Sequence, residues 1–171
     1  MSIPYDVIII GAGAAGMMSA IEAGKRGRKV LLVDHYKKIG EKIRISGGGR
    51  CNFTNIHTNP NKFLSQNPKF VRSALSQYTQ NDFINLINKY EIKFHEKKLG
   101  QLFCDHSAQQ IVEMLLKECE LANVTILKEF VIKEIDKENN EYYVSTETEK
   151  FSSESLIIAT GGLSVPKIGA T

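Results

Sequence analysis

The stretch Tyr5-Asp-Val-Ile-Ile-Ile-Gly11-Ala-Gly13-Ala-Ala-Gly16 decides the fold of this chain. A short β-branched run ends in three glycines with GxGxxG spacing, and a helical pattern follows. Gly11 allows a tight turn after the strand, Gly13 has no side chain to block a pyrophosphate, and Gly16 lets the helix pack close to the sheet. The N-terminus of that helix directs unpaired N–H groups and partial positive charge toward the phosphates.

An acidic residue completes this pattern. Asp34 directly follows the apolar run Val30-Leu-Leu-Val33 and lies eighteen residues after Gly16 (34 − 16 = 18). A carboxylate in that position can accept hydrogen bonds from ribose hydroxyls. A glycine-rich turn in an ordinary strand–turn–helix unit would give Asp34 no role. The segment therefore predicts a binding site for an adenine dinucleotide.

Hydrophobic periodicity and turn residues predict the other elements. A Gly, Asn, Ser and Thr-rich connection over residues 36–68 has the length typical of functional loops. The expected helices are residues 14–26, 70–78, 82–90 and 108–121, the last capped by Ser107; the expected strands are 29–33, a hairpin over 92–103, then 124–135, 141–146, 150–151 and a buried strand at 156–159.

Two further glycine clusters bear on which dinucleotide is bound. The segment Ser46-Gly-Gly-Gly-Arg50-Cys51-Asn52 can turn successive backbone N–H groups inward as an anion nest, with Arg50 adding donors. Ala159-Thr160-Gly161-Gly162 follows an expected strand, at the edge where open α/β sheets bind ligands. A simple NAD domain needs neither feature. A longer cofactor that extends beyond the first motif accounts for both, although a flexible linker at 46–55 stays an alternative.

Charge distribution gives weaker evidence on partners. The net charge is +3, but residues 25–50 hold nine Lys or Arg against two acids, a surplus of +7 (9 − 2) that leaves −4 elsewhere. A basic stretch beside a phosphate-binding turn suits a polyanionic cofactor. Nucleic acid is the alternative, but Tyr36 is the one aromatic residue in that stretch, so stacking on bases has little support and nucleic acid is an unlikely partner.

Other patterns narrow the chemistry. Cys51, Cys104 and Cys119 form no close pair, which argues against a disulfide framework and indicates a reducing, cytoplasmic compartment. The apolar run at 7–21 is too short to span a bilayer, so we expect no membrane association. No metal-ligand spacing joins the four histidines. The neighbours 104–106 resemble a nucleophile cluster, but we assign them to a loop or the surface and name no catalytic residue.

The chain resembles a known family. Residues 8–16, Lys42 with residues 46–55, and residues 156–171 look like the bacterial BaiN-like (YhiN-type) NAD(P)/FAD-dependent oxidoreductases. The Gly-Gly-Gly-Arg-Cys-Asn block is the most specific of these motifs. The resemblance runs along the whole chain but covers only the front part of the family pattern, whose members are more than twice as long. Residues 102–105 depart from it, because the family typically has Phe-Pro there.

The resemblance implies a fold and a set of cofactor contacts. The fold would be α/β: a Rossmann-like FAD-binding domain of the glutathione-reductase type, with a parallel central sheet and a β-meander, over residues 1–171 as an N-terminal fragment, in which 36–106 form a glycine-rich loop and a small helical and hairpin excursion. In that fold the FAD phosphates would contact Gly11, Gly13, Ala14 and Ala15, the adenosine ribose would contact Asp34, and the adenine would contact the backbone of Val131. The middle and flavin end of the cofactor would lie along Lys42, Gly48, Gly49, Arg50, Cys51 and Asn52. The segment Ala159, Thr160 and Gly161 would close over the ribose and pyrophosphate.

The implied activity is hydride transfer from NAD(P)H through FAD to an organic small molecule. Two alternatives stay open: a plain NAD(P)-binding dehydrogenase module, and an FAD protein resembling those that modify tRNA. Substrate, nicotinamide preference and oligomeric state are not readable from these residues. We expect the isolated 171-residue chain to be inactive and to self-associate through the surface that a missing domain would cover.

Overall fold

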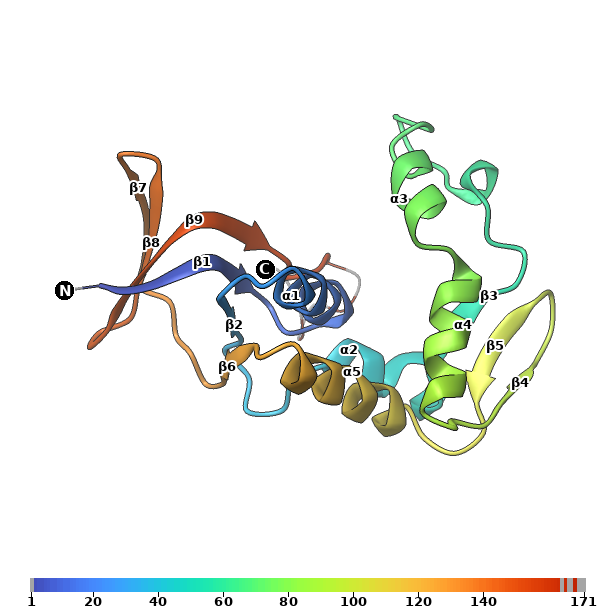
Figure 1. Cartoon of the computed structure of the whole chain (residues 1–171). Helices are drawn as coiled ribbons and strands as arrows, with labels where there is room; N and C mark the ends of the chain where they lie inside the picture. Colours follow the sequence, from blue (N-terminus) through green and yellow to red (C-terminus); the bar gives the residue numbers. More distant parts are fainter. Residues whose placement is uncertain (1, 164, 166–167, 169–171) are drawn as a thin grey trace. The chain divides into compact units, whose positions relative to one another are not determined.

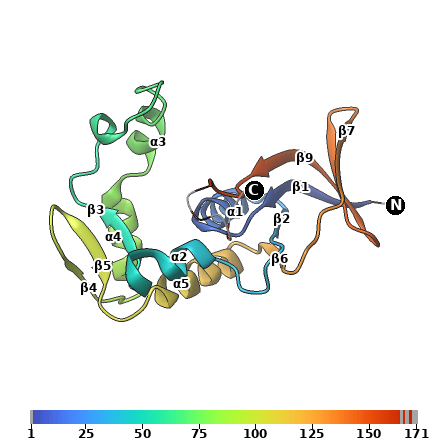
Figure 2. The same ribbon diagram turned by 180° about the vertical axis from the view of Figure 1, so that it is seen from behind.

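The computed structural model describes residues 2–163, 165 and 168, and it divides the chain into two compact units (Figures 1 and 2). Unit 1 comprises Met1–Lys42 and Leu115–Thr171, and unit 2 comprises Ile43–Met114. One boundary falls inside helix α5 (Gln109–Leu121). The excursion expected at residues 36–106 therefore overlaps unit 2.

Unit 1 is built on a six-stranded sheet with the order β6-β2-β1-β9-β8-β7. β6, β2, β1 and β9 are parallel neighbours, whereas β9, β8 and β7 form an antiparallel meander. The strands are β1 (Ile3–Ile10), β2 (Val30–Val33), β6 (Thr125–Leu127), β7 (Glu134–Glu138), β8 (Glu141–Ser145) and β9 (Lys150–Ile158). This arrangement confirms the predicted Rossmann-like α/β fold with a parallel central sheet and a β-meander.

Helix α1 (Ala14–Lys25) packs against β1 and β2 through Met17, Ala20 and Ile21, which are buried. Its far end lies against the C-terminal end of α5. A Cβ added to Gly24 would lie 2.3 Å from the Ala122 carbonyl oxygen, so a larger residue there would push the two segments apart. Lys25 forms a 3.0 Å ion pair with the buried carboxylate of Glu118 nearby.

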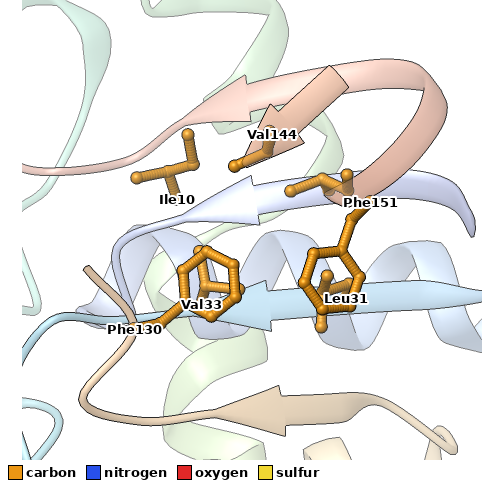
Figure 3. Close-up of a cluster of buried hydrophobic side chains, with 7 residues drawn as sticks. Ile10, Leu31, Val33, Phe130, Val144 and Phe151 are labelled. Carbon is orange, nitrogen blue, oxygen red and sulfur yellow. The ribbon is translucent and has the colours of Figure 1, made fainter. Parts of the chain in front are cut away.

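A second hydrophobic cluster lies around the sheet and the connection that follows β6, as Figure 3 shows. Alternation along the strands presents Ile8 and Ile10 of β1, with Leu31 and Val33 of β2, to Phe130 of that connection. Val144 of β8 and Phe151 of β9 complete the cluster, and the Phe130 and Phe151 rings lie 5.5 Å apart. The connection after β6 thus covers part of the sheet with an aromatic side chain.

Two strands differ from the sequence predictions. Residues 150–151 and 156–159 were expected as separate strands, but one strand, β9, runs from Lys150 to Ile158 because it pairs with β1 over almost its whole length. Its serines 152 and 153 lie between the two expected strands but are buried in the sheet. Its end is not buried as predicted, since Ile158 is 61 % exposed. The strand expected over 124–135 is interrupted, with no strand between β6 and β7.

Unit 2 is a small α/β unit with the antiparallel sheet β3-β5-β4. The prediction of a long loop at 36–68 is wrong in detail, because four short elements lie within this segment. Those four are α2 (Glu41–Ile45), the 3-10 turn η1 (Ser46–Gly49), β3 (Asn52–Asn55) and the 3-10 turn η2 (Pro60–Lys62); they are followed by α3 (Arg72–Gln77), α4 (Gln80–Lys89), β4 (Phe94–Glu96) and β5 (Gln101–Cys104). The predicted helices and hairpin are confirmed, with bounds that differ by at most two residues at each end.

Helix α4 begins at a capping box in which the Thr79 and Asp82 side chains each bond the other's backbone N–H. It packs on β3, where the Phe53 ring lies 6.1 Å from that of Phe83 and meets Phe94 edge-on at 5.4 Å. Ile87 is fully buried. The aromatic cluster therefore holds α4 against the small sheet.

Candidate dinucleotide-binding site

The three glycines of the first motif have different roles in unit 1. Gly11 has a φ of +103°, and a Cβ on it would lie 2.5 Å from the carbonyl oxygen of Ala159. A Cβ on Gly16 would lie 1.8 Å from the carbonyl oxygen of Gly11. A Cβ on Gly13 would meet nothing within 4 Å. Gly11 and Gly16 are therefore required by the fold, whereas Gly13 adjoins open space.

That open space lies where the helix begins. Gly13 is the N-cap of α1, with no side-chain cap, and its carbonyl accepts the Met17 N–H at 2.9 Å. Ala14 and Ala15 form the first turn, so the N-terminal N–H groups of α1 stand beside the space that a Gly13 side chain would fill. These features fit a pyrophosphate, which needs donors, partial positive charge and close backbone approach.

Asp34 fastens the turn to the end of β2. One carboxylate oxygen accepts the Ala12 N–H at 2.7 Å, and the other accepts the Tyr36 N–H at 2.9 Å. The side chain is 12 % exposed, and the His35 Nδ1 lies 3.7 Å from it. Each carboxylate oxygen has a second lone pair, so Asp34 can still accept a ribose hydroxyl. The sequence predicted the ribose role but not the two backbone contacts.

Lys42 and the segment after β9 come together at the same edge. The Lys42 ammonium donates to the Gly162 carbonyl and lies 3.4 Å from where a Gly161 Cβ would be. The N–H of Ala159 donates to the Ile10 carbonyl at 2.8 Å, which joins this segment to the end of β1. Thr160 and Gly161 follow and are exposed. The structure thus places four predicted site residues beside the glycine turn.

Val131 lies in the connection between β6 and β7. The preceding residue is fixed to the end of β2, because the Phe130 N–H donates to the Asp34 carbonyl at 3.0 Å. The Val131 side chain is 58 % exposed, and within the described residues its peptide groups take no hydrogen bond. Its backbone is therefore available near Asp34, as an adenine contact requires, although it is not part of a strand.

The second glycine cluster forms a left-handed turn in unit 2. Gly47, Gly48 and Gly49 have φ values of +58°, +67° and +85°. The N–H groups of Arg50 and Cys51 both donate to the Ser46 carbonyl, so these two donors are satisfied inside the turn rather than turned outward as a nest. A Cβ on Gly47 would lie 2.7 Å from the Phe103 ring, whereas one on Gly48 would meet nothing.

Further bonds tie this turn to the rest of unit 2. The Gly49 carbonyl accepts the Ala108 N–H at 2.7 Å, and the Arg50 carbonyl accepts the Cys104 N–H at 2.9 Å. With its amide turned toward two carbonyls, Asn52 can donate to Leu102 and Thr54 at 3.2 Å each. Gly48 and the Arg50 side chain remain exposed. Gly47 is exposed as well, so these three residues are the part of the turn that a ligand could reach.

The cysteines of unit 2 are structural. Burial raises the pKa of the Cys51 thiol, and a hydrogen bond with Ser46 opposes this only in part. Burial, with smaller effects of Cys51 and Asp105, raises the pKa of Cys104 to about 11. Cys104 is fully buried in β5, so the prediction of a loop or surface position for it is wrong. Neither thiol has the lowered pKa of a nucleophile.

One polar pair escaped the sequence analysis. His95 on β4 and Asp105 after β5 lie 2.7 Å apart between Nδ1 and Oδ1, and both are partly exposed. The hairpin register pairs His95 with Phe103, and their rings are stacked 6.4 Å apart. The hairpin expected over residues 92–103 is the signal that could have found this pair, because it brings its two strands side by side. Within the described residues, no group of three or more acidic, His or Cys side chains is placed to hold a metal ion.

Comparison with known families now gives a family assignment. The HI0933-like protein Rossmann domain family matches residues 5–171, almost the whole chain. The chain belongs to this family. The HI0933-like chain is 54 % identical over 167 residues to the ribosomal RNA dihydrouridine synthase of Escherichia coli K12, and 48 % identical over 175 residues to the one of Haemophilus influenzae Rd.

Those alignments take in 98 % and 100 % of this HI0933-like chain but 42 % and 44 % of the relatives, so it spans about two fifths of their length. Among solved structures, the halogenase PltM in complex with phloroglucinol and FAD matches with a TM-score of 0.54 and 18 % identity, over 91 % of this chain and 34 % of that one. That likeness concerns the fold alone. No helix in the described part of the chain is long and apolar enough to cross a bilayer.

Proposed function

We propose that unit 1 binds FAD and that the chain is the cofactor-binding part of a flavin-dependent oxidoreductase. The observation that carries this proposal is the open space at Gly13, beside the N-terminus of α1 and next to a turn held by Asp34. The fold similarity to a halogenase solved with FAD supports it. The choice of FAD over NAD rests on the glycine clusters at 46–49 and 159–162 and on family membership.

The residues of unit 1 would bind and orient the cofactor. The N–H groups at the start of α1 would hold the pyrophosphate against Gly13, and the free lone pairs of Asp34 would accept ribose hydroxyls. Lys42 would hold the segment after β9 in place through Gly162. When bound, the flavin supplies hydride transfer, and the protein contributes position and surroundings.

We further propose that the substrate is a uridine of ribosomal RNA. Sequence alone favoured a small molecule, with an FAD protein resembling those that modify tRNA as an alternative. Two relatives, at 54 % and 48 % identity, are ribosomal RNA dihydrouridine synthases, which favours an RNA substrate over a small molecule. Dihydrouridine differs from uridine by two hydrogens across the C5–C6 double bond of the base. The reaction therefore needs one hydride, which we assign to NAD(P)H through the flavin, and one proton.

Two measurements on the full-length protein that carries this chain test the proposal. Denatured protein should release FAD, and release of NAD or of no cofactor would contradict the flavin assignment. Ribosomal RNA from cells that lack the protein should gain dihydrouridine, seen by mass spectrometry, when incubated with the protein and NAD(P)H. The Gly13→Val variant is the control, because it removes the cofactor space without a clash in the fold. If the protein releases FAD but does not reduce the RNA, the cofactor proposal stands and the proposed ribosomal RNA substrate is rejected.

A further inference from the structure

One surface of unit 2 combines exposed cations with exposed aromatic rings. Residues 42–81 contain six Lys or Arg and no Asp or Glu. Part of this segment, between β3 and α4, extends beyond the N-terminal end of α4, with α3 at its far end (Figure 1). Every residue from 61 to 70 is exposed. This composition differs from that of the 25–50 stretch, because aromatic residues lie among the charges.

The segment contains the same short turn motif twice. Asn59-Pro60-Asn61-Lys62-Phe63 and Asn67-Pro68-Lys69-Phe70 are two Asn-Pro turns that each end in Lys-Phe. In each, the Asn side chain accepts a backbone N–H two residues later: that of Asn61 at 3.0 Å and that of Lys69 at 3.2 Å. The Asn carbonyls accept the N–H groups of Lys62 and Phe70 at 3.0 and 3.1 Å. Each Lys-Phe pair is therefore held by local bonds.

Both phenylalanine rings of these pairs are exposed to solvent. Phe63 is 42 % exposed and Phe70 is 78 % exposed, which is unfavourable for large apolar rings in water. In the part of the chain that the structure describes, no carboxylate pairs with Lys62, Lys69 or Arg72. The two ends of the segment are joined, because the Gln80 side chain at the start of α4 donates to the Ile56 carbonyl just after β3 at 3.2 Å.

We propose that this surface, formed by Lys62, Phe63, Lys69, Phe70 and Arg72, binds unpaired RNA. It rests on the proposed ribosomal RNA substrate and names a contact surface for it. Phosphates are attracted to cations that no acid neutralises, and bases stack on exposed aromatic rings whatever their sequence. Duplex RNA hides its bases, so the surface should prefer single strands and loops. A protein partner could bury the exposed rings, but a protein interface would not explain why forty consecutive residues contain no Asp or Glu.

The test uses the full-length protein and a fluorescent oligouridine of about 12 nucleotides, a length within the usual range of single-strand sites. The variant Lys69→Ala/Phe70→Ala should bind it about tenfold or more weakly, and the salt dependence of its affinity should fall by about one unit of slope. The matched control is Lys98→Ala/Leu99→Ala, an equally exposed Lys-apolar pair at the β4–β5 turn of the same unit, which should lose little. Phe70→Tyr alone should bind oligouridine as tightly as the unsubstituted protein, because tyrosine keeps the aromatic ring.

Several outcomes would overturn the proposal. They are no affinity of the unsubstituted protein for oligouridine, equal losses in both double variants, and equal binding of a duplex of the same length. A fourth is that Lys69→Ala/Phe70→Ala keeps its RNA affinity but loses its flavin or aggregates. That result would show that the surface packs against protein. Flavin content is read in the same samples. Absence of flavin with RNA binding that depends on Phe70 would reject the oxidoreductase and keep the RNA surface.

Discussion

The carboxylate of Asp34 accepts a hydrogen bond from the peptide N–H of Ala12 at 2.7 Å. This contact joins the end of β2 to the turn that follows β1, across twenty-two residues of sequence. The acid that a dinucleotide motif assigns to ribose therefore also fixes the turn that would receive the phosphates in the proposed site. One side chain therefore couples the ribose end of the proposed site to its phosphate end.

Gly13→Val should abolish FAD binding and leave the fold intact. The backbone at Gly13 is extended, with φ −82° and ψ −170°, which valine adopts readily, and its side chain would enter open space that the pyrophosphate needs. Flavin content and thermal unfolding check this. In contrast, Gly16→Ala should lower the melting temperature, because its Cβ would meet the Gly11 carbonyl at 1.8 Å. Equal FAD affinity in Gly13→Val and the unsubstituted protein would show that the motif is only structural.

Asp34→Ala should weaken FAD binding and also destabilise the cofactor-free protein. It removes an acceptor shared by two peptide N–H groups, and a lost hydrogen bond to a charged group costs about 1.5–3 kcal/mol. Denaturant unfolding of the cofactor-free protein measures the second effect. The neighbouring substitution His35→Ala is the control and should change stability little, since that ring is mostly exposed. Stability of Asp34→Ala equal to that of His35→Ala would reject the structural role.

Arg50→Ala in the full-length protein should weaken FAD binding about tenfold or more, as loss of one charge-assisted contact implies. Arg72→Ala should leave FAD affinity unchanged and weaken RNA binding instead. Both arginines are exposed in unit 2, so the two substitutions remove the same charge from equally accessible positions. Titration of the cofactor-free protein with FAD gives both affinities. Unchanged affinity of Arg50→Ala would reduce the triple-glycine turn to a structural connection.

Cys104 should make the fold less stable at high pH. Its pKa is raised to about 11 in the folded state, so the neutral thiol is preferred there. The stabilisation is fully present below the pKa of the unfolded chain, about 9.0, and is lost as pH rises toward about 11, because only the unfolded chain forms thiolate readily. Cys104→Ala should show a smaller fall in unfolding free energy between those pH values. An equal fall in both proteins would contradict this.

The 171-residue chain on its own should hold FAD poorly and oxidise NAD(P)H far more slowly than the full-length protein. Apolar side chains such as those of Ile158 and Val131 are more than half exposed in it, and such surfaces favour association. Sedimentation of the isolated chain should therefore show oligomers. Oxidation of NAD(P)H by the isolated chain at the full-length rate would contradict the prediction.

Local sequence determined the first part of the fold. The run from Tyr5 to Gly16, the helix after it and Asp34 could be assigned because strand alternation, turn glycines and helix signals act over a few residues. The Thr79 cap of α4 and the β4–β5 turn are equally local. The proposed dinucleotide site could be located from the sequence for the same reason, since its expected phosphate-binding part is one continuous segment.

Tertiary structure decided what depends on distant pairs. Serines 152 and 153 belong to β9 because β1 and β8 supply hydrogen-bond partners on both sides, which their own polarity does not indicate. Cys104 is buried because β3 and β4 flank β5, and that burial raises its pKa. The bonds Asp34–Ala12 and Lys42–Gly162 join residues far apart along the chain. Residues distant in sequence meet only when the sheet forms, so a pattern read along one chain shows which groups could serve a site, and packing decides which of them do.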